Sequence, residues 1–175
     1  TTTYKQTREQ AFAIGAGLKC LGMQKGDKVA LLSQGRNLWI TSELGILYAG
    51  GVNVPLSIKL GESSDLLFRI KHSDSKIIIV SEQQLPKIRT ILNECANVEH
   101  VIVLDPLTQY QDKEISIEDV IQKGKDYLKE HSDEWKALYQ SIQPDDYANI
   151  SYTSGTTADP KGILLTHRNY TANVE

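Results

Sequence analysis

Short apolar runs alternate with helical patterns along the first part of the chain. Ala11, Ile14, Leu18 and Leu21 recur at steps of three and four residues, which is the spacing of an amphipathic helix. The run KVALLS at 28–33 follows this pattern and predicts a strand, because it is short, apolar and bounded by polar residues.

The ends of the first helices carry residues that favour caps and turns. Thr3 with Gln6 has the form of a capping box, and Gly22 accepts the left-handed conformation that a helix exit often needs. Asn37 is expected to cap a second helix that runs to about residue 49. Apolar side chains around most of its circumference predict that this helix is buried.

The alternation of strands and helices continues toward the middle of the chain. Ser63 or Ser64 is expected to cap the next helix. The expected strands are at 52–56, 76–80 and 101–104, and the expected helices lie around 63–70 and 85–92. Such alternation favours an α/β fold, a mainly parallel sheet flanked by helices, whose strands are buried on both faces.

Residues 105–146 interrupt this alternation. A polar loop is expected to run to about residue 114, followed by a helix that Ser116 caps. A second helix should carry Trp135 on its apolar side. We interpret 105–146 as a helical insertion in a single unit that covers residues 1–175.

The final part of the chain returns to strands. The segment 147–152 and the apolar run 163–165 each predict a strand, and a helix is expected to start near residue 166. The segment that joins the two strands therefore lies in a strand–loop–strand context.

Composition and charge narrow the class of protein. The chain has 175 residues, 40% hydrophobic and 23% charged, which is enough for one packed domain. A net charge of -3 without a cluster of basic residues argues against a nucleic-acid-binding surface. The apolar runs are too short to cross a bilayer. Cys20 and Cys95 lie far apart and outside any C-x-x-C, which favours a reducing, cytoplasmic setting.

The segment 152–162 (YTSGTTADPKG) carries the candidate chemistry. Its hydroxyl, glycine and lysine residues are Thr153, Ser154, Gly155, Thr156, Thr157 and Lys161. Hydroxyls and main-chain amides can converge on one phosphate, and lysine adds a mobile positive charge. On composition alone, the segment is equally compatible with an ordinary turn between two strands.

The spacing of this segment differs from that of a Walker loop. Gly155 and Lys161 match G-x-x-x-x-G-K, but Pro160 stands at the second glycine and contributes no N–H. Gly162 replaces the Ser or Thr that would hold magnesium. A strand is expected to follow at 163–165, so phosphate binding by a helix N-terminus is not indicated.

The segment 152–162 resembles the phosphate-loop signature of the adenylate-forming (AMP-binding) superfamily, which comprises acyl- and aryl-CoA ligases, peptide-synthetase adenylation domains and luciferases. Residues 47–56 (LYAGGVNVPL) and 26–30 (GDKVA) are similar to further motifs of that family, so the resemblance covers almost the whole chain. Residues 166–169 (THRN) and the helical insertion are most like long-chain fatty acid–CoA ligases (acyl-CoA synthetases). Ala158 departs from the family, which usually has glycine there.

The resemblance implies an ATP-dependent ligase that activates a long-chain fatty acid as an acyl-adenylate and transfers the acyl group to coenzyme A, with Mg²⁺. It implies that the polyphosphate is bound by Thr153, Ser154, Gly155, Thr156 and Thr157, with Lys161 pairing electrostatically. It also implies that the catalytic residues and a C-terminal domain lie outside the chain. We therefore expect an N-terminal fragment of the AMP-binding domain that is inactive by itself.

Two alternatives remain open. An amino-acid-activating adenylation domain would share the loop, and a non-catalytic nucleotide-binding module could keep the loop without the chemistry, as the alanine at 158 would allow. The expected partners are ATP, a fatty acid and coenzyme A, without nucleic acid. A fatty-acid substrate leaves room for peripheral membrane contact, and the sequence sets no oligomeric state. His72, His100, His131 and His167 make no metal-ligand spacing.

Overall fold

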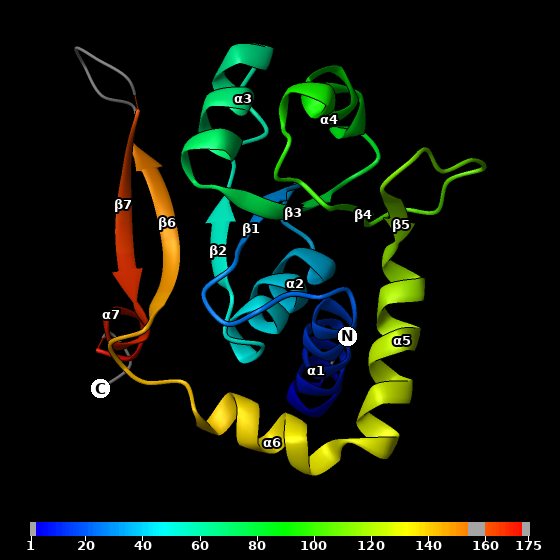
Figure 1. Cartoon of the computed structure of the whole chain (residues 1–175), viewed down its shortest axis with the longest axis vertical. Coiled ribbons are helices and arrows are strands. Elements are labelled where there is room, and N and C mark those ends of the chain that lie inside the picture. Colours follow the sequence, from blue (N-terminus) through cyan, green and yellow to red (C-terminus); the bar gives the residue numbers. More distant parts are fainter. Residues whose placement is uncertain (1–2, 154–159, 173–175) are drawn as a thin grey trace.

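A computed structural model describes residues 3–153 and 160–172 (Figure 1). The helices are α1 (Tyr4–Cys20), α2 (Asn37–Tyr48), α3 (Ser63–His72), α4 (Leu85–Ile91), α5 (Ile117–Glu130), α6 (Ser132–Gln140) and α7 (His167–Thr171), with a 3₁₀ turn η1 at Leu92–Glu94. The strands are β1 (Lys28–Leu32), β2 (Val52–Pro55), β3 (Ser75–Val80), β4 (His100–Val103), β5 (Glu114–Ser116), β6 (Tyr147–Thr153) and β7 (Lys161–Thr166).

The strands form one mixed sheet in the order β5-β4-β3-β1-β2-β6-β7. Neighbours from β5 to β6 are parallel, and β7 runs antiparallel to β6. The expectation of a mainly parallel sheet flanked by helices is confirmed.

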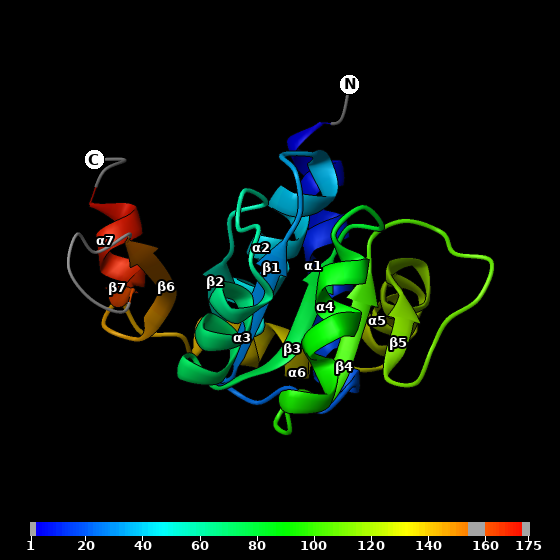
Figure 2. The ribbon, with the colours of Figure 1, turned by 90° about the horizontal axis from the view of Figure 1, so that it is seen from above.

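Alternate residues of the central strands enter two hydrophobic cores. Val29 and Leu31 of β1 pack with α1, α2 and α5, whereas Ala30 and Leu32 pack with α3 and α4. Figure 2 shows these two groups of helices on opposite faces of the sheet. Because both faces are covered, the central strands are apolar at nearly every position.

The contact between α1 and α5 depends on glycine. A Cβ atom at Gly124 would lie 1.8 Å from the carbonyl oxygen of Ala13, and one at Gly17 would lie 2.2 Å from that of Val120. The two helices can therefore approach this closely only because these positions carry no side chain.

The caps of the first helices agree with the sequence in part. Thr3 and Gln6 form the expected capping box, and Gly22 has a φ of 95°. The N-cap of α2 is Arg36 rather than Asn37, because Arg36 is the last residue with extended backbone. In the same way, Glu62 rather than a serine is the N-cap of α3.

The expected burial of α2 around most of its circumference is wrong. Ile40 is half exposed, and the residues that are buried are Thr41, Ser42, Gly45 and Ile46. Small residues face α1 because the two backbones are close there: a Cβ at Gly45 would lie 2.9 Å from the carbonyl oxygen of Ala11. Close backbone approach therefore adds small residues to the buried face beside Ile46, which lies in the hydrophobic core.

The segment 105–146 contains a strand that the sequence pattern did not predict. The expected polar loop ends in β5, which pairs in parallel with β4. Arg89 donates from Nε and Nη2 to the two carboxylate oxygens of Glu114, at 2.7 and 2.8 Å, and this ties β5 to α4. Ser116 caps α5 as expected, accepting a hydrogen bond from the amide of Asp119 at 3.0 Å.

The α6 helix closes one edge of the core beneath α1. Trp135 is 2% exposed, and its ring lies 5.7 Å from that of Phe12 in an edge-to-face arrangement.

In residues 3–153 and 160–172, no helix combines the length and apolar content that a membrane crossing requires.

Candidate functional site

The candidate loop joins the two strands of the β6–β7 hairpin. Thr153, the last residue of β6, stands opposite Lys161, the first residue of β7, in antiparallel register. Both residues are exposed. Ser154, Gly155, Thr156 and Thr157, together with Ala158, lie outside the residues that the structure describes.

The two described site residues offer groups that suit an anion. The side chain of Lys161 makes no ion pair with any residue in the described part of the chain, so its charge is not neutralised there. The exposed hydroxyl of Thr153 lies across the hairpin from it. A phosphate between the strand ends could accept a hydrogen bond from the hydroxyl and pair with the ammonium group.

Main-chain pairing attaches the hairpin to the sheet at one position. Asn149 of β6 is in register with Asn53 of β2, whereas β1 and β2 are in register at four positions. Figure 2 shows β6, β7 and α7 grouped to one side of the rest of the sheet. Side chains must therefore contribute much of the attachment.

A polar network joins the foot of the hairpin to β2 and α2. The Oε1 atom of Glu43 accepts hydrogen bonds from Nδ2 of Asn53 at 3.0 Å and from the hydroxyl of Tyr170 at 3.1 Å. The Tyr170 oxygen accepts from Nδ2 of Asn149 at 3.0 Å, and Ser151 donates to Oδ1 of Asn149 at 2.8 Å. We call Glu43, Asn53, Asn149 and Tyr170 the Glu43 network.

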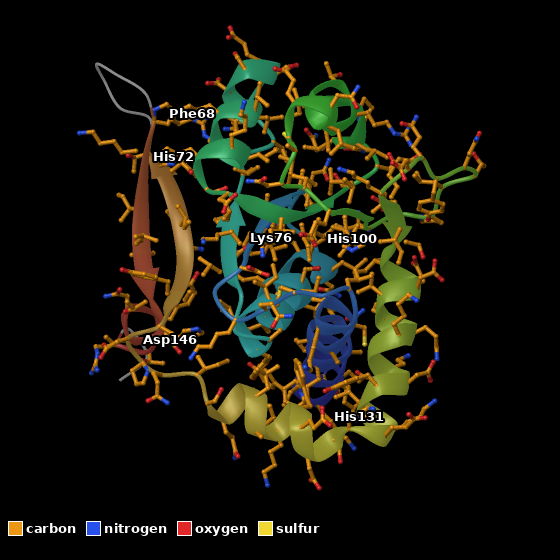
Figure 3. The ribbon with its side chains drawn as sticks, viewed as in Figure 1. Phe68, His72, Lys76, His100, His131 and Asp146 are labelled. Carbon is orange, nitrogen blue, oxygen red and sulfur yellow. The ribbon has the colours of Figure 1, made fainter. Side chains whose placement is uncertain are left out.

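A second set of contacts holds the opposite face of β6 against α3. The hydroxyl of Tyr152 lies 2.9 Å from Nδ1 of His72 and donates to the carbonyl oxygen of Arg69 at 3.3 Å. The guanidinium of Arg69 lies 5.7 Å from the centre of the Tyr152 ring, and Phe68 stacks on His72. Figure 3 shows Phe68 and His72 on the side of α3 that faces the hairpin. Burial raises the pKa of Tyr152, so its hydroxyl stays neutral.

Two aspartates fix the turn before β6, and Figure 3 labels one of them, Asp146. Asp146 pairs with Lys25 at 2.6 Å and accepts a hydrogen bond from the amide of Gln143 at 2.7 Å. Both contacts hold the pKa of Asp146 below its ordinary value, the lysine more strongly. Asp145 pairs with Arg168 at 2.9 Å on the surface. These carboxylates therefore stabilise the turn.

The histidines do not gather at one place. His72 contacts Tyr152, and His131 lies 3.2 Å from Glu134 through Nδ1. Burial lowers the pKa of His167. Within the described ranges, no three His, Cys, Asp or Glu side chains form a group that could hold a metal ion.

The residues that hold the hairpin were not identified from the sequence. A signal was present, because Asn53 stands between two valines in β2, Asn149 stands between Ala148 and Ile150 in β6, and both asparagines are buried. A buried amide needs hydrogen-bond partners, so such positions predict a polar contact across strands. The partners Glu43 and Tyr170 are far away in the sequence and could not be assigned from it.

Comparison with known proteins gives a consistent result. The family described as AMP-binding enzyme matches residues 1–175. A chloroplastic long-chain-fatty-acid–[acyl-carrier-protein] ligase of Arabidopsis thaliana is 34% identical over 179 residues, covering 95% of this chain and 24% of the relative. A long-chain-fatty-acid–CoA ligase of Bacillus subtilis (strain 168) is 28% identical, covering 99% of this chain and 33% of the relative.

The fold also has close counterparts among solved structures. The crystal structure of an anthranilate CoA ligase in complex with anthranoyl-AMP superposes with a TM-score of 0.81 at 25% identity, covering 98% of this chain and 31% of that one. The chain thus spans between about a quarter and a third of the length of the proteins it matches.

Proposed function

The chain belongs to the AMP-binding enzyme family of adenylate-forming ligases, and from this we propose that it is part of a ligase that activates a long-chain fatty acid with ATP and transfers the acyl group to coenzyme A. The observation that carries the site assignment is the hairpin, which places Thr153 opposite Lys161, a cation that makes no ion pair with the residues that the structure describes. The similarity to fatty-acid ligases supports the choice of acid.

The chemistry requires a good leaving group on a carboxylate. A carboxylate is a poor electrophile. In the first step it reacts with ATP to form the acyl-adenylate, and pyrophosphate leaves. In the second step the thiol attacks the acyl-adenylate, and AMP leaves. Oriented donors that stabilise charge on the β- and γ-phosphates favour this reaction. We assign that role to the hydroxyls and amides of residues 153–157, with Lys161 pairing with a phosphate oxygen.

Magnesium suits this site as a partner of the nucleotide. Mg²⁺ commonly binds substrate phosphates with few protein ligands, and it would neutralise charge on the departing pyrophosphate. Lys161, which has no ion-pair partner within residues 3–153 and 160–172, and the exposed Thr153 fit an anionic ligand of this kind.

The acceptor thiol has a second candidate. One relative is named for transfer to acyl carrier protein and another for transfer to coenzyme A. Coenzyme A remains our proposal, and acyl carrier protein is the alternative that assays must separate. The cytoplasmic setting also stays a prediction, since the Arabidopsis relative is chloroplastic.

Exchange of pyrophosphate into ATP tests the site in the complete enzyme. Lys161→Ala and Thr156→Ala should each lower the fatty-acid-dependent exchange rate by about two to three powers of ten, because each removes a donor to the phosphates. Lys136→Ala is a matched control, since Lys136 is exposed on α6 and makes no ion pair with any described residue. Unchanged exchange in the Lys161→Ala enzyme would refute the assignment.

The identity of the substrates is tested with the same assay. Fatty acids should stimulate exchange, and amino acids should not; the reverse would indicate an amino-acid-activating domain. ATP binding without exchange for any acid would indicate a non-catalytic module. Coenzyme A and acyl carrier protein can then be compared as acceptors. We expect residues 1–175 alone to form no acyl thioester, because the relatives that carry the activity are about three to four times longer.

A further inference from the structure

We propose that Glu43 and Tyr170 are positioning residues for the phosphate loop, an inference that rests on the proposed function. Neither residue lies in the loop. Both belong to the Glu43 network, which joins α2, β2, β6 and α7 at the foot of the hairpin. This network holds β6 beside β2, where the main chains are in register at the single pair Asn53 and Asn149.

The burial of Asn53 argues that the network does more than stabilise the fold. Its side chain is fully buried and donates to Glu43, but its Oδ1 atom has no hydrogen-bond partner among the residues described. A half-satisfied buried amide costs stability, and an aliphatic residue would suit a parallel strand better. What the amide contributes is orientation: it fixes the carboxylate of Glu43 so that the same oxygen also meets Tyr170.

The directions of the hydrogen bonds are defined by charge and burial. Burial, followed by the charge of Glu43 and the hydrogen bond to it, raises the pKa of Tyr170 to about 12. The hydroxyl therefore keeps its proton at neutral pH, donates to Glu43 and accepts from Asn149. Because each of these hydrogen bonds has a defined donor and acceptor, the network favours one position of β6 relative to β2 and α2.

A small movement at the foot of the hairpin would be large enough to matter at the loop. Asn149 and Thr153 are about 13 Å apart along the strand at ~3.3 Å per residue, so a tilt of about 5° moves Thr153 by about 1 Å. A misplacement of about 1 Å can cost ~10²-fold in rate. The contacts of Tyr152 with α3 oppose movement on the other face of β6, so both faces must be held to fix the tip.

Tyr170→Phe in the complete enzyme removes one hydroxyl and keeps the ring. We expect kcat/KM for ATP in pyrophosphate exchange to fall about tenfold, within the range that a displacement near 1 Å can produce. Amide hydrogen exchange should become faster in residues 147–153 and 161–166 and stay unchanged in β1 and β3. Tyr147→Phe is the matched control on the same hairpin, because its half-exposed hydroxyl makes no hydrogen bond with the described residues.

Substitutions of Glu43 separate positioning from a general structural role. Glu43→Gln keeps an acceptor oxygen and should stay near wild-type turnover, whereas Glu43→Ala should match Tyr170→Phe. In the Glu43→Ala background, Tyr170→Phe should have little further effect, because the two residues act through one shared atom. Independent, additive effects would contradict the proposal, as would a Tyr170→Phe variant in which β1 and β3 exchange as fast as the hairpin.

The two proposals fail in different ways. A wild-type enzyme that does not exchange pyrophosphate with any acid refutes the proposed function. A wild-type enzyme with normal exchange, together with an unaffected Tyr170→Phe variant, refutes the positioning role alone.

Discussion

The centre of the sheet and the β6–β7 hairpin are held by different forces. In β3, the four residues Ile77 to Val80 are almost fully buried and in register with neighbours on both sides. In β7, Ile163 and Leu164 are about half exposed, and the hairpin meets β2 in register at one position. Hydrophobic burial thus dominates at the centre, whereas the hairpin, in which Ala148 and Ile150 are buried, depends in addition on a few directional polar contacts.

This difference suits the proposed roles of the two regions, with stability supplied by the centre of the sheet and the phosphate site carried by the hairpin. Burial is non-directional and scales with area, so it gives the centre stability with little sensitivity to any one polar group. Hydrogen bonds contribute less free energy each but define angles and distances. The proposed phosphate site would need such geometry, and Thr153 and Lys161 stand opposite each other at the ends of the two strands.

Truncating isoleucine in the two regions should separate them most strongly. Ile79→Ala in β3 removes a fully buried side chain and should lower the free energy of unfolding by about 2 to 5 kcal/mol. Ile163→Ala in β7, where the side chain is 47% exposed, should change it by no more than about 0.5 kcal/mol. Urea unfolding of the protein measures both, and equal losses would contradict the contrast.

The far edge of the sheet offers a charged counterpart to the hairpin. The side chain of Glu114 is 1% exposed, and the hydrogen bonds from Arg89 are the main cause that lowers its pKa below the usual 4.5. Glu114→Gln should lower the free energy of unfolding by about 2 kcal/mol at neutral pH, since hydrogen bonds to a charged group are lost.

The pH dependence of this effect has a defined sign. Because the pKa of Glu114 is lower in the folded state, its stabilisation is present above about pH 4.5 and lost as the pH falls through the lowered value. The gap between wild type and Glu114→Gln should therefore close on acidification, as measured by unfolding at several pH values. Asp126→Asn is the control: Asp126 pairs with Lys129 but is 56% exposed, so little change is expected.

The smallest predicted effect concerns the contact between the hairpin and α3. Tyr152→Phe removes the hydroxyl that meets His72 and the carbonyl of Arg69. We expect a loss of about 1 kcal/mol in the local opening free energy of β6 and β7, with global stability nearly unchanged. Amide hydrogen exchange measures this. A loss spread evenly over β1 and β3 would show that the contact belongs to the core instead.

The sequence predicted most helices and strands, but it missed one short strand and misjudged the burial of one helix. In the part of the chain that the structure describes, the sequence pattern located the seven α-helices and six of the seven strands, because burial imposes a regular spacing of apolar residues. It missed β5, whose three residues are too few for a pattern and whose Glu114 is held by Arg89 from a distant position in the chain. It also misjudged α2, where close backbone approach selects small residues for the buried face.

The sequence by itself determined the alternating architecture, the family and the candidate loop, because these depend on local periodicity and on a contiguous motif. Only the tertiary structure decided how the hairpin is attached, since Glu43, Asn53, Asn149 and Tyr170 come from four separate elements. Hydrogen bonds between such distant residues leave no periodic signal in a chain. They depend on distances and angles that exist only once the sheet has formed.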